Sequence, residues 1–213
     1  MTSSLTPFDS AQFLQCAESI VVASRAIYSR GWSPATSSNY SVRLNASCCA
    51  VTVSGKHKGE LTADDVMVVD LEGRPLVNKK PSAETLLHTQ LYKRDADIGA
   101  VLHTHSVCAT VLTMAQPNVD TLVLRGYELL KAFNSVQTHN TELHIPIFEN
   151  TQDMVELSQR VEKRMQREGV GVAYLIRGHG LYTWAEDLAA CMRHLEALEF
   201  LLDCGGRRHS ARP

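Results

Sequence analysis

The 213-residue chain lacks the sequence features of several protein classes. It contains no run of about 18 apolar residues that would cross a membrane, and its first eight residues lack the basic and then apolar order of a signal peptide. Its six cysteines include no Cys-x-x-Cys pair, so a thiolate zinc site is not expected. A net charge of −2 favours neither a nucleic-acid nor a membrane partner. We expect a cytoplasmic protein with reduced thiols.

The composition is that of a folded domain. Hydrophobic residues make up 44% of the chain, which is enough for a core of good size. The length fits one domain over residues 1–213, with an ordered core over about 9–204. The tail 205–213 is rich in glycine and arginine and is expected to be mobile.

Apolar periodicity predicts helices and strands that alternate along the chain. The expected helices cover about 10–29, 82–94, 106–114, 127–133, 151–166 and 188–203, and the expected strands cover 39–44, 50–54, 66–70, 99–103, 121–124, 143–147 and 172–176. Ser82 is the expected N-cap of the second helix, and a threonine that of the helix from 151. Short turns between the first strands favour antiparallel pairing. No Gly-x-Gly-x-x-Gly opens a helix, which disfavours a Rossmann arrangement and leaves a layered α/β domain.

Two histidines one residue apart, His103 and His105, follow an apolar strand. Alternate side chains of a strand lie on the same face, so two imidazoles at this spacing can bind one metal ion. A third candidate is His179, which stands between two glycines. Taken alone, such a pair is more often two ordinary strand-end histidines. Together the three histidines indicate a zinc site with a coordination position left open for substrate.

Three segments contain the groups that bind an anion. Residues 36–41, 52–56 and 80–84 combine small hydroxyls, an amide, glycine and the expected start of a helix. Each segment alone is more often a plain turn or cap. Hydroxyls and exposed backbone N–H groups at a helix N-terminus are what a phosphate monoester requires, so three such segments in one domain indicate a phosphate pocket.

Two glutamates are candidates for proton transfer. Glu84 and Glu128 each stand in the first turn of an expected helix, a place where the helix dipole favours a carboxylate in any case. A carboxylate beside a metal ion is also the natural base for removing a proton next to a carbonyl. Tyr182 follows His179 closely but is expected to pack in the core. The unpaired histidines, His88 among them, are expected to be surface or core residues.

In order along the chain, these motifs resemble those of the class II aldolase and adducin family. The matching segments are Ser38–Ser41, Val53–Gly55, Pro81–Glu84, His103–His105 and Arg177–Gly180. The resemblance spans roughly residues 10–203. It implies a three-layer α/β/α fold with a mixed, largely antiparallel central sheet, and a homotetramer. It also implies one Zn²⁺ per subunit, bound by His103, His105 and His179, and phosphate binding by Asn39, Ser54, Gly55 and Ser82.

The resemblance further implies a zinc-dependent dehydration of 5-methylthioribulose 1-phosphate to 2,3-diketo-5-methylthiopentyl 1-phosphate, a reaction of methionine salvage. Aldolases of the family use the glutamate at the position of Glu84 as acid and base. Eukaryotic relatives that catalyse the dehydration rely instead on one at the position of Glu128. We expect Glu128 to take the proton and Glu84 or a water to protonate the leaving hydroxyl.

Two other functions remain open from the sequence. The first is a sugar-phosphate aldolase or epimerase of the fuculose or ribulose phosphate type, which the metal-binding residues cannot distinguish from a dehydratase. The second is an adducin-like interaction module without catalysis, which would have no need of three metal ligands and two carboxylates.

Overall fold

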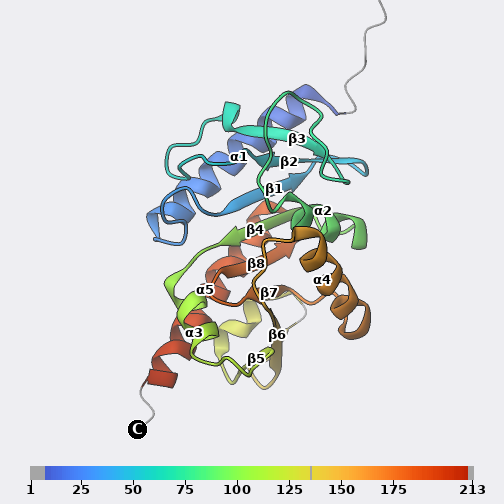
Figure 1. The fold of residues 1–213 in the computed structure, drawn as a ribbon. Helices are drawn as coiled ribbons and strands as arrows, with labels where there is room; N and C mark the ends of the chain where they lie inside the picture. The colour runs from blue at the N-terminus through green and yellow to red at the C-terminus, as the bar shows by residue number, and fades with distance from the viewer. Residues whose placement is uncertain (1–7, 135, 211–213) are drawn as a thin grey trace, which may run out of the picture.

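The computed structural model describes residues 8–134 and 136–210 (Figure 1). The helices are α1 (Ser10–Ser29), α2 (Thr85–Arg94), α3 (Val107–Met114), α4 (Met154–Glu168) and α5 (Leu188–Ser210), with short 3₁₀ turns η1 (Ala63–Asp65) and η2 (Glu128–Ala132). The strands are β1 (Asn39–Arg43), β2 (Cys48–Thr52), β3 (Val66–Asp70), β4 (Ala100–Thr104), β5 (Thr121–Arg125), β6 (Glu142–Phe148), β7 (Ala173–Ile176) and β8 (Gly180–Ala185).

The strands form one sheet in the order β3-β2-β1-β4-β8-β7-β6-β5. Each pair of neighbours is antiparallel except β6 and β7, which are parallel. The prediction of a mixed, largely antiparallel sheet is therefore confirmed. Strand β4 lies near the middle, between a strand from the first quarter of the chain and a strand from its last quarter. All five residues of β4 are buried, as expected for a strand covered on both faces.

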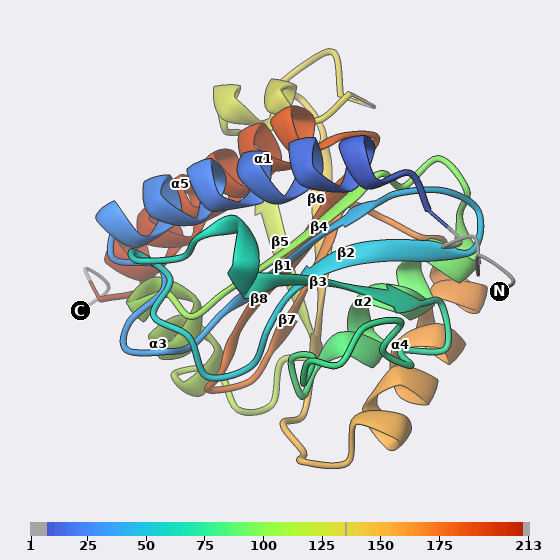
Figure 2. The ribbon, with the colours of Figure 1, turned by 90° about the horizontal axis from the view of Figure 1, so that it is seen from above.

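Helices cover both faces of the sheet (Figure 2). Helices α1 and α5 share one core with alternate strand residues, and this core includes Ile20, Leu198 and Leu102. Helices α2 and α4 share the other core, which includes Leu87, Leu157 and Val101. Neighbouring residues of β4 thus enter opposite cores, as the two-residue period of a strand requires. No helix in the described part of the chain combines the length and apolar character needed to cross a bilayer.

Four expectations for the elements need correction. Strand β8 is absent from the prediction. Helix α2 begins at Thr85 with Glu84 as its N-cap residue, so Ser82 is not the cap. Helix α4 begins at Met154, where the side chain of Asp153 accepts from a backbone N–H. Helix α5 runs to Ser210, so part of the tail expected to be mobile is helical.

Candidate active site

The three predicted histidines meet at one end of the sheet. His103 is the fourth residue of β4, His105 follows that strand, and His179 lies in the turn between β7 and β8. The Nε2 atoms of His103 and His105 are 2.8 Å apart. The carboxylate of Glu84 joins them, and one ligand atom from each of the four residues lies within 4.8 Å of the others. The prediction that these histidines converge agrees with this geometry.

The turn that carries His179 is built from its two glycines. Gly178 has a φ of 63°, which favours glycine. A Cβ on Gly180 would lie 1.9 Å from the carbonyl oxygen of Thr104, so only glycine lets this turn approach β4. The guanidinium of Arg177 anchors the turn by donating to three backbone carbonyls, one at the end of α3 and two in the segment that follows it. The Arg-Gly-His-Gly motif therefore places one imidazole beside a neighbouring strand.

The donor atoms suit a metal ion. Nδ1 of His103 donates to the carbonyl of Leu181 at 2.9 Å, so Nε2 carries a lone pair. That lone pair faces Oε2 of Glu84 at 3.3 Å, and Nε2 of His179 is 3.1 Å from the other carboxylate oxygen. Tetrahedral bonds of about 2.0–2.1 Å hold ligand atoms about 3.3 Å apart, close to these separations. A bound cation would balance the facing lone pairs.

Burial keeps the imidazoles of His103 and His105 neutral, as metal ligation requires. It lowers the pKa of His103 to about 4 and, together with the neighbouring imidazoles, that of His105 to about 3. Burial alone would raise the pKa of Glu84, but the surrounding imidazoles and the amide of Asn39 outweigh it and hold that pKa well below its usual range. At neutral pH the imidazoles of His103 and His105 are therefore neutral, and Glu84 is a carboxylate.

A row of polar side chains crosses four strands on the face covered by α2. In the sheet register Asn39 is paired with His103, His103 with Tyr182, and Tyr182 with Tyr174. The rings of His103 and Tyr182 stack at 4.0 Å. The hydroxyl of Tyr182 donates to Glu84 at 2.9 Å, and the amide of Asn39 donates to the same oxygen at 2.8 Å. Tyr182 is thus part of the site, where the sequence favoured simple packing.

His88 supports this row through a hydrogen bond to Asn39. Its Nε2 bonds the amide oxygen of Asn39, and its Nδ1 bonds the hydroxyl of Ser41 at 2.8 Å, which in turn bonds that of Tyr92 at 2.7 Å. Because the amide nitrogen of Asn39 donates to Glu84, the amide oxygen must accept, and Nε2 of His88 must carry the proton. His88 is a buried positioning residue that fixes the orientation of Asn39.

The four residues predicted to bind phosphate lie together. Asn39, Ser54, Gly55 and Ser82 line a cavity of about 220 Å³, and Glu84 and His105 line it too. The segments that carry Ser54 and Ser82 are joined because the N–H of Ser54 donates to the carbonyl of Lys80 at 3.1 Å. The three anion-binding segments and His105 thus border one space.

Glu128 stands apart from this cavity in its own chain. The C-terminal end of β6 lies nearest the histidines, and β5 starts beside that end. Strand β5 then runs away from the histidines, because its last residue, Arg125, pairs with Glu142 at the far end of β6. Glu128 follows β5, in η2. Its side chain is 71% exposed and pairs with Lys131 and with His139. One chain therefore cannot bring both glutamates to its histidines.

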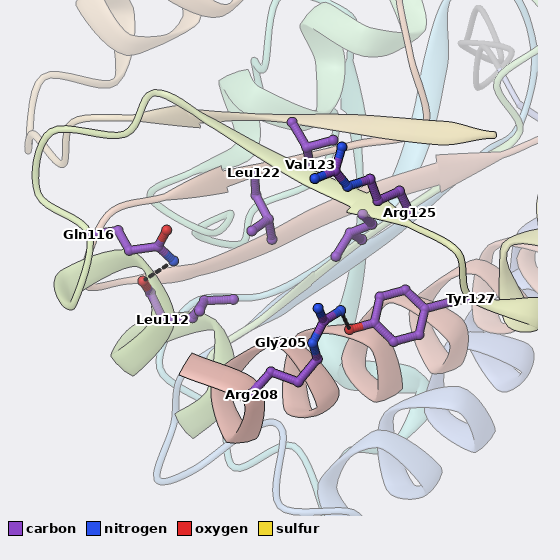
Figure 3. A pocket seen from close by; sticks show the side chains of 9 residues that line it. Leu112, Gln116, Leu122, Val123, Arg125, Tyr127, Gly205 and Arg208 are labelled. Carbon is purple, nitrogen blue, oxygen red and sulfur yellow. Dashed lines mark hydrogen bonds between the residues drawn. The ribbon is translucent and has the colours of Figure 1, made fainter. Parts of the chain in front are cut away.

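A second cavity, of about 200 Å³, lies between β5, α3 and the end of α5 (Figure 3). Leucines line it together with Arg125, Tyr127 and Arg208, and Arg208 donates to the hydroxyl of Tyr127 at 3.2 Å. Among its described lining residues there is no histidine and no carboxylate. Through this hydrogen bond α5 contacts Tyr127, the residue that precedes Glu128.

Comparison with known proteins agrees with this geometry. A model of the Class II Aldolase and Adducin N-terminal domain matches residues 18–204. The chain belongs to the class II aldolase and adducin family. Among solved structures, L-fuculose-1-phosphate aldolase from Thermus thermophilus superposes with a TM-score of 0.69 at 24% identity, covering 92% of this chain and 93% of that one. At this identity the likeness shows the family fold alone.

Two relatives within the family are much closer in sequence. A methylthioribulose-1-phosphate dehydratase from Alcanivorax borkumensis is 55% identical over 92% of this chain and 92% of its own length. A protein of the same name from Marinobacter nauticus is 54% identical over 92% of this chain and 95% of its own length.

Proposed function

We propose that the protein is a zinc-dependent lyase that dehydrates 5-methylthioribulose 1-phosphate to 2,3-diketo-5-methylthiopentyl 1-phosphate in methionine salvage. The observation that carries this proposal is the cluster of Glu84 with three histidines beside a cavity lined by the predicted phosphate-binding residues. The names of relatives at 54–55% identity favour dehydration over the cleavage or epimerisation that the same residues could serve.

Each part of the site has a role in this reaction. Asn39, Ser54, Gly55 and Ser82 hold the phosphate and so place the ketose beside the histidines. His103, His105 and His179 would bind the Zn²⁺, which when bound polarises the substrate carbonyl and acidifies the proton on C3.

Two carboxylates handle the protons. Glu84, ionised in the cluster, accepts the proton of the C3 hydroxyl and gives it to the departing C4 hydroxyl, which leaves as water. Glu128 of the partner subunit takes the proton from C3 and returns it to C4 as the enol becomes the diketone. This assignment requires an oligomer, and we propose the homotetramer that the family resemblance implies, four copies of a 23.5 kDa chain.

Product analysis tests the reaction. Zinc-loaded protein incubated with 5-methylthioribulose 1-phosphate is expected to release one water per substrate and to form a diketone, detected by mass spectrometry. The same protein is expected to leave L-fuculose 1-phosphate and ribulose 5-phosphate unchanged. Cleavage of a carbon–carbon bond would identify an aldolase, and an unchanged set of substrates would contradict an enzymatic role.

A further inference from the structure

The cavity beside the histidines has one cationic side chain among its described lining residues. The groups predicted to bind phosphate are hydroxyls, an amide and backbone N–H groups, all of them neutral. Lys58 is the single lysine or arginine among the residues that line the space, and it is 1% exposed. Residues of this type are almost never fully buried unless an anion is beside them.

Lys58 is fixed in place by the two loops that border the cavity. Its Nζ donates to the carbonyl of Lys56 at 2.7 Å and to that of Thr36 at 3.3 Å. Its own carbonyl accepts from the hydroxyl of Ser24 at 2.6 Å. An ammonium group has three donors, so the acceptors in the described structure leave one donor for a ligand.

The charge of Lys58 has no carboxylate in contact with it. None of the ion pairs in the described residues includes Lys58, and the nearby Asp65 is instead paired with Lys56 at 3.0 Å. Burial lowers the pKa of Lys58 to about 8, against the opposing effect of Asp65. The ammonium form therefore predominates at pH 7. A buried cation without an anion is costly, and a bound anion would remove that cost.

We propose that Lys58 neutralises the phosphate of the substrate, as the charged member of an otherwise neutral phosphate-binding set. A phosphate monoester carries a charge of about −1.5 to −2 at pH 7, which hydroxyls and amides bind but do not balance. The proposal rests on the proposed function in so far as the phosphate belongs to the substrate. The chemistry it requires is that of a phosphate dianion in this cavity, whichever bond of the sugar then breaks.

A pair of lysines provides the test. Lys58→Met removes the buried charge, and Lys163→Met removes an exposed one on α4 that does not line the cavity. The binding of inorganic phosphate to the zinc-loaded protein is measured by calorimetry, with zinc content as a control. We expect Lys58→Met to weaken phosphate binding at least tenfold and to raise KM more than it lowers kcat. Lys163→Met is expected to change the affinity by less than twofold.

The opposite results would overturn the proposal. If Lys58→Met binds phosphate as the wild type does and only unfolds at lower temperature, Lys58 is a brace between the two loops. Phosphate that binds only to the metal ion would likewise be insensitive to this substitution. If Lys58→Met does not fold, Lys58→Gln keeps a donor for the two carbonyls and allows the same comparison. Because phosphate binding is measured without turnover, its outcome is independent of the product analysis.

Discussion

The two ends of the sheet hold a glutamate each, in opposite surroundings. Glu84 is 13% exposed, and an amide, a phenol and two imidazoles surround its carboxylate. Glu128 is 71% exposed, and its partners are a lysine and a histidine that are themselves half exposed. Both residues precede or begin a short helical segment in the sequence, yet only one faces the histidines of its own chain.

This difference shows how the same residue type acquires different chemistry. The surroundings of Glu84 favour the ionised form and hold its carboxylate against the three histidines, so any group that exchanges a proton with it must be bound at that cluster. Glu128 lies on the surface, where only a second molecule can bring it to a substrate. The comparison therefore turns on whether the active site needs one chain or two.

The largest expected effect on activity comes from replacing His103, which is buried at the centre of the histidine cluster. His103→Ala is expected to abolish both zinc binding and activity, because His103 contacts both His105 and Glu84. The matched control is His144→Ala, which removes an exposed histidine of β6 and should change neither property. Zinc content by mass spectrometry and turnover measure the effect. Full activity in a metal-free variant would contradict the metal assignment.

The next largest effect on activity is expected at the exposed Glu128. Glu128→Gln is expected to retain zinc and to lose about 10²–10⁴-fold in kcat, the usual range for a general base. Glu142→Gln, on the same end of the sheet, serves as control. Mixed oligomers of Glu128→Gln and His103→Ala should regain activity, since some sites then combine intact histidines with an intact Glu128. Mixed oligomers as inactive as their parents would place the whole site within one chain.

A smaller loss is expected at Glu84. Glu84→Gln should lower kcat by about 10²-fold at most, because water can also carry the proton of the C3 hydroxyl. The comparison with Glu128→Gln is made at equal zinc content, so that weaker metal binding is not mistaken for slower proton transfer. If Glu84→Gln is the more damaging substitution, Glu84 is the principal base.

The smallest effect concerns stability and pH. The pKa of His88 is lowered to about 4 by burial, so on acidification the unfolded chain takes up a proton before the folded one does. Its stabilising contribution is complete above about pH 6.5 and is lost as the pH falls to about 4. Between pH 7 and 4, wild type should lose about 3 kcal/mol more unfolding free energy than His88→Gln. Denaturant titrations measure this difference, and parallel curves would contradict it.

Local patterns were enough to predict that the three histidines converge. The His-x-His spacing and the Gly-His-Gly turn depend on backbone geometry within a few residues, and the structure brings both to one place. The predicted start of α2 was wrong because the true start depends on a contact that is distant in the sequence. Pro81 forms a β-bridge with Val53, and this contact holds the residues just before Thr85 out of the helix.

Properties set by strand order could not be predicted from the sequence. Strand β8 is six residues long and starts with glycine, which weakens its periodic pattern. Without β8 there is no register to place Tyr182 beside His103. The order of motifs along the chain also does not show at which end of the sheet β5 finishes, so Glu84 and Glu128 were expected at one site. The end of α5 was misplaced because Gly205 and Gly206 favour a stop, whereas Gly205 packs close to Leu112 of α3.

The position of β4 in the middle of the sheet has a consequence for folding. Its neighbours are a strand near the start of the chain and one near its end, and the clustered histidines come from β4 and the residue that follows it, and from the turn before β8. Bringing such distant segments together costs loop-closure entropy before any contact is gained, so this pairing should form late. A metal ion would then bind only after these strands have paired, and no early folding intermediate would bind it.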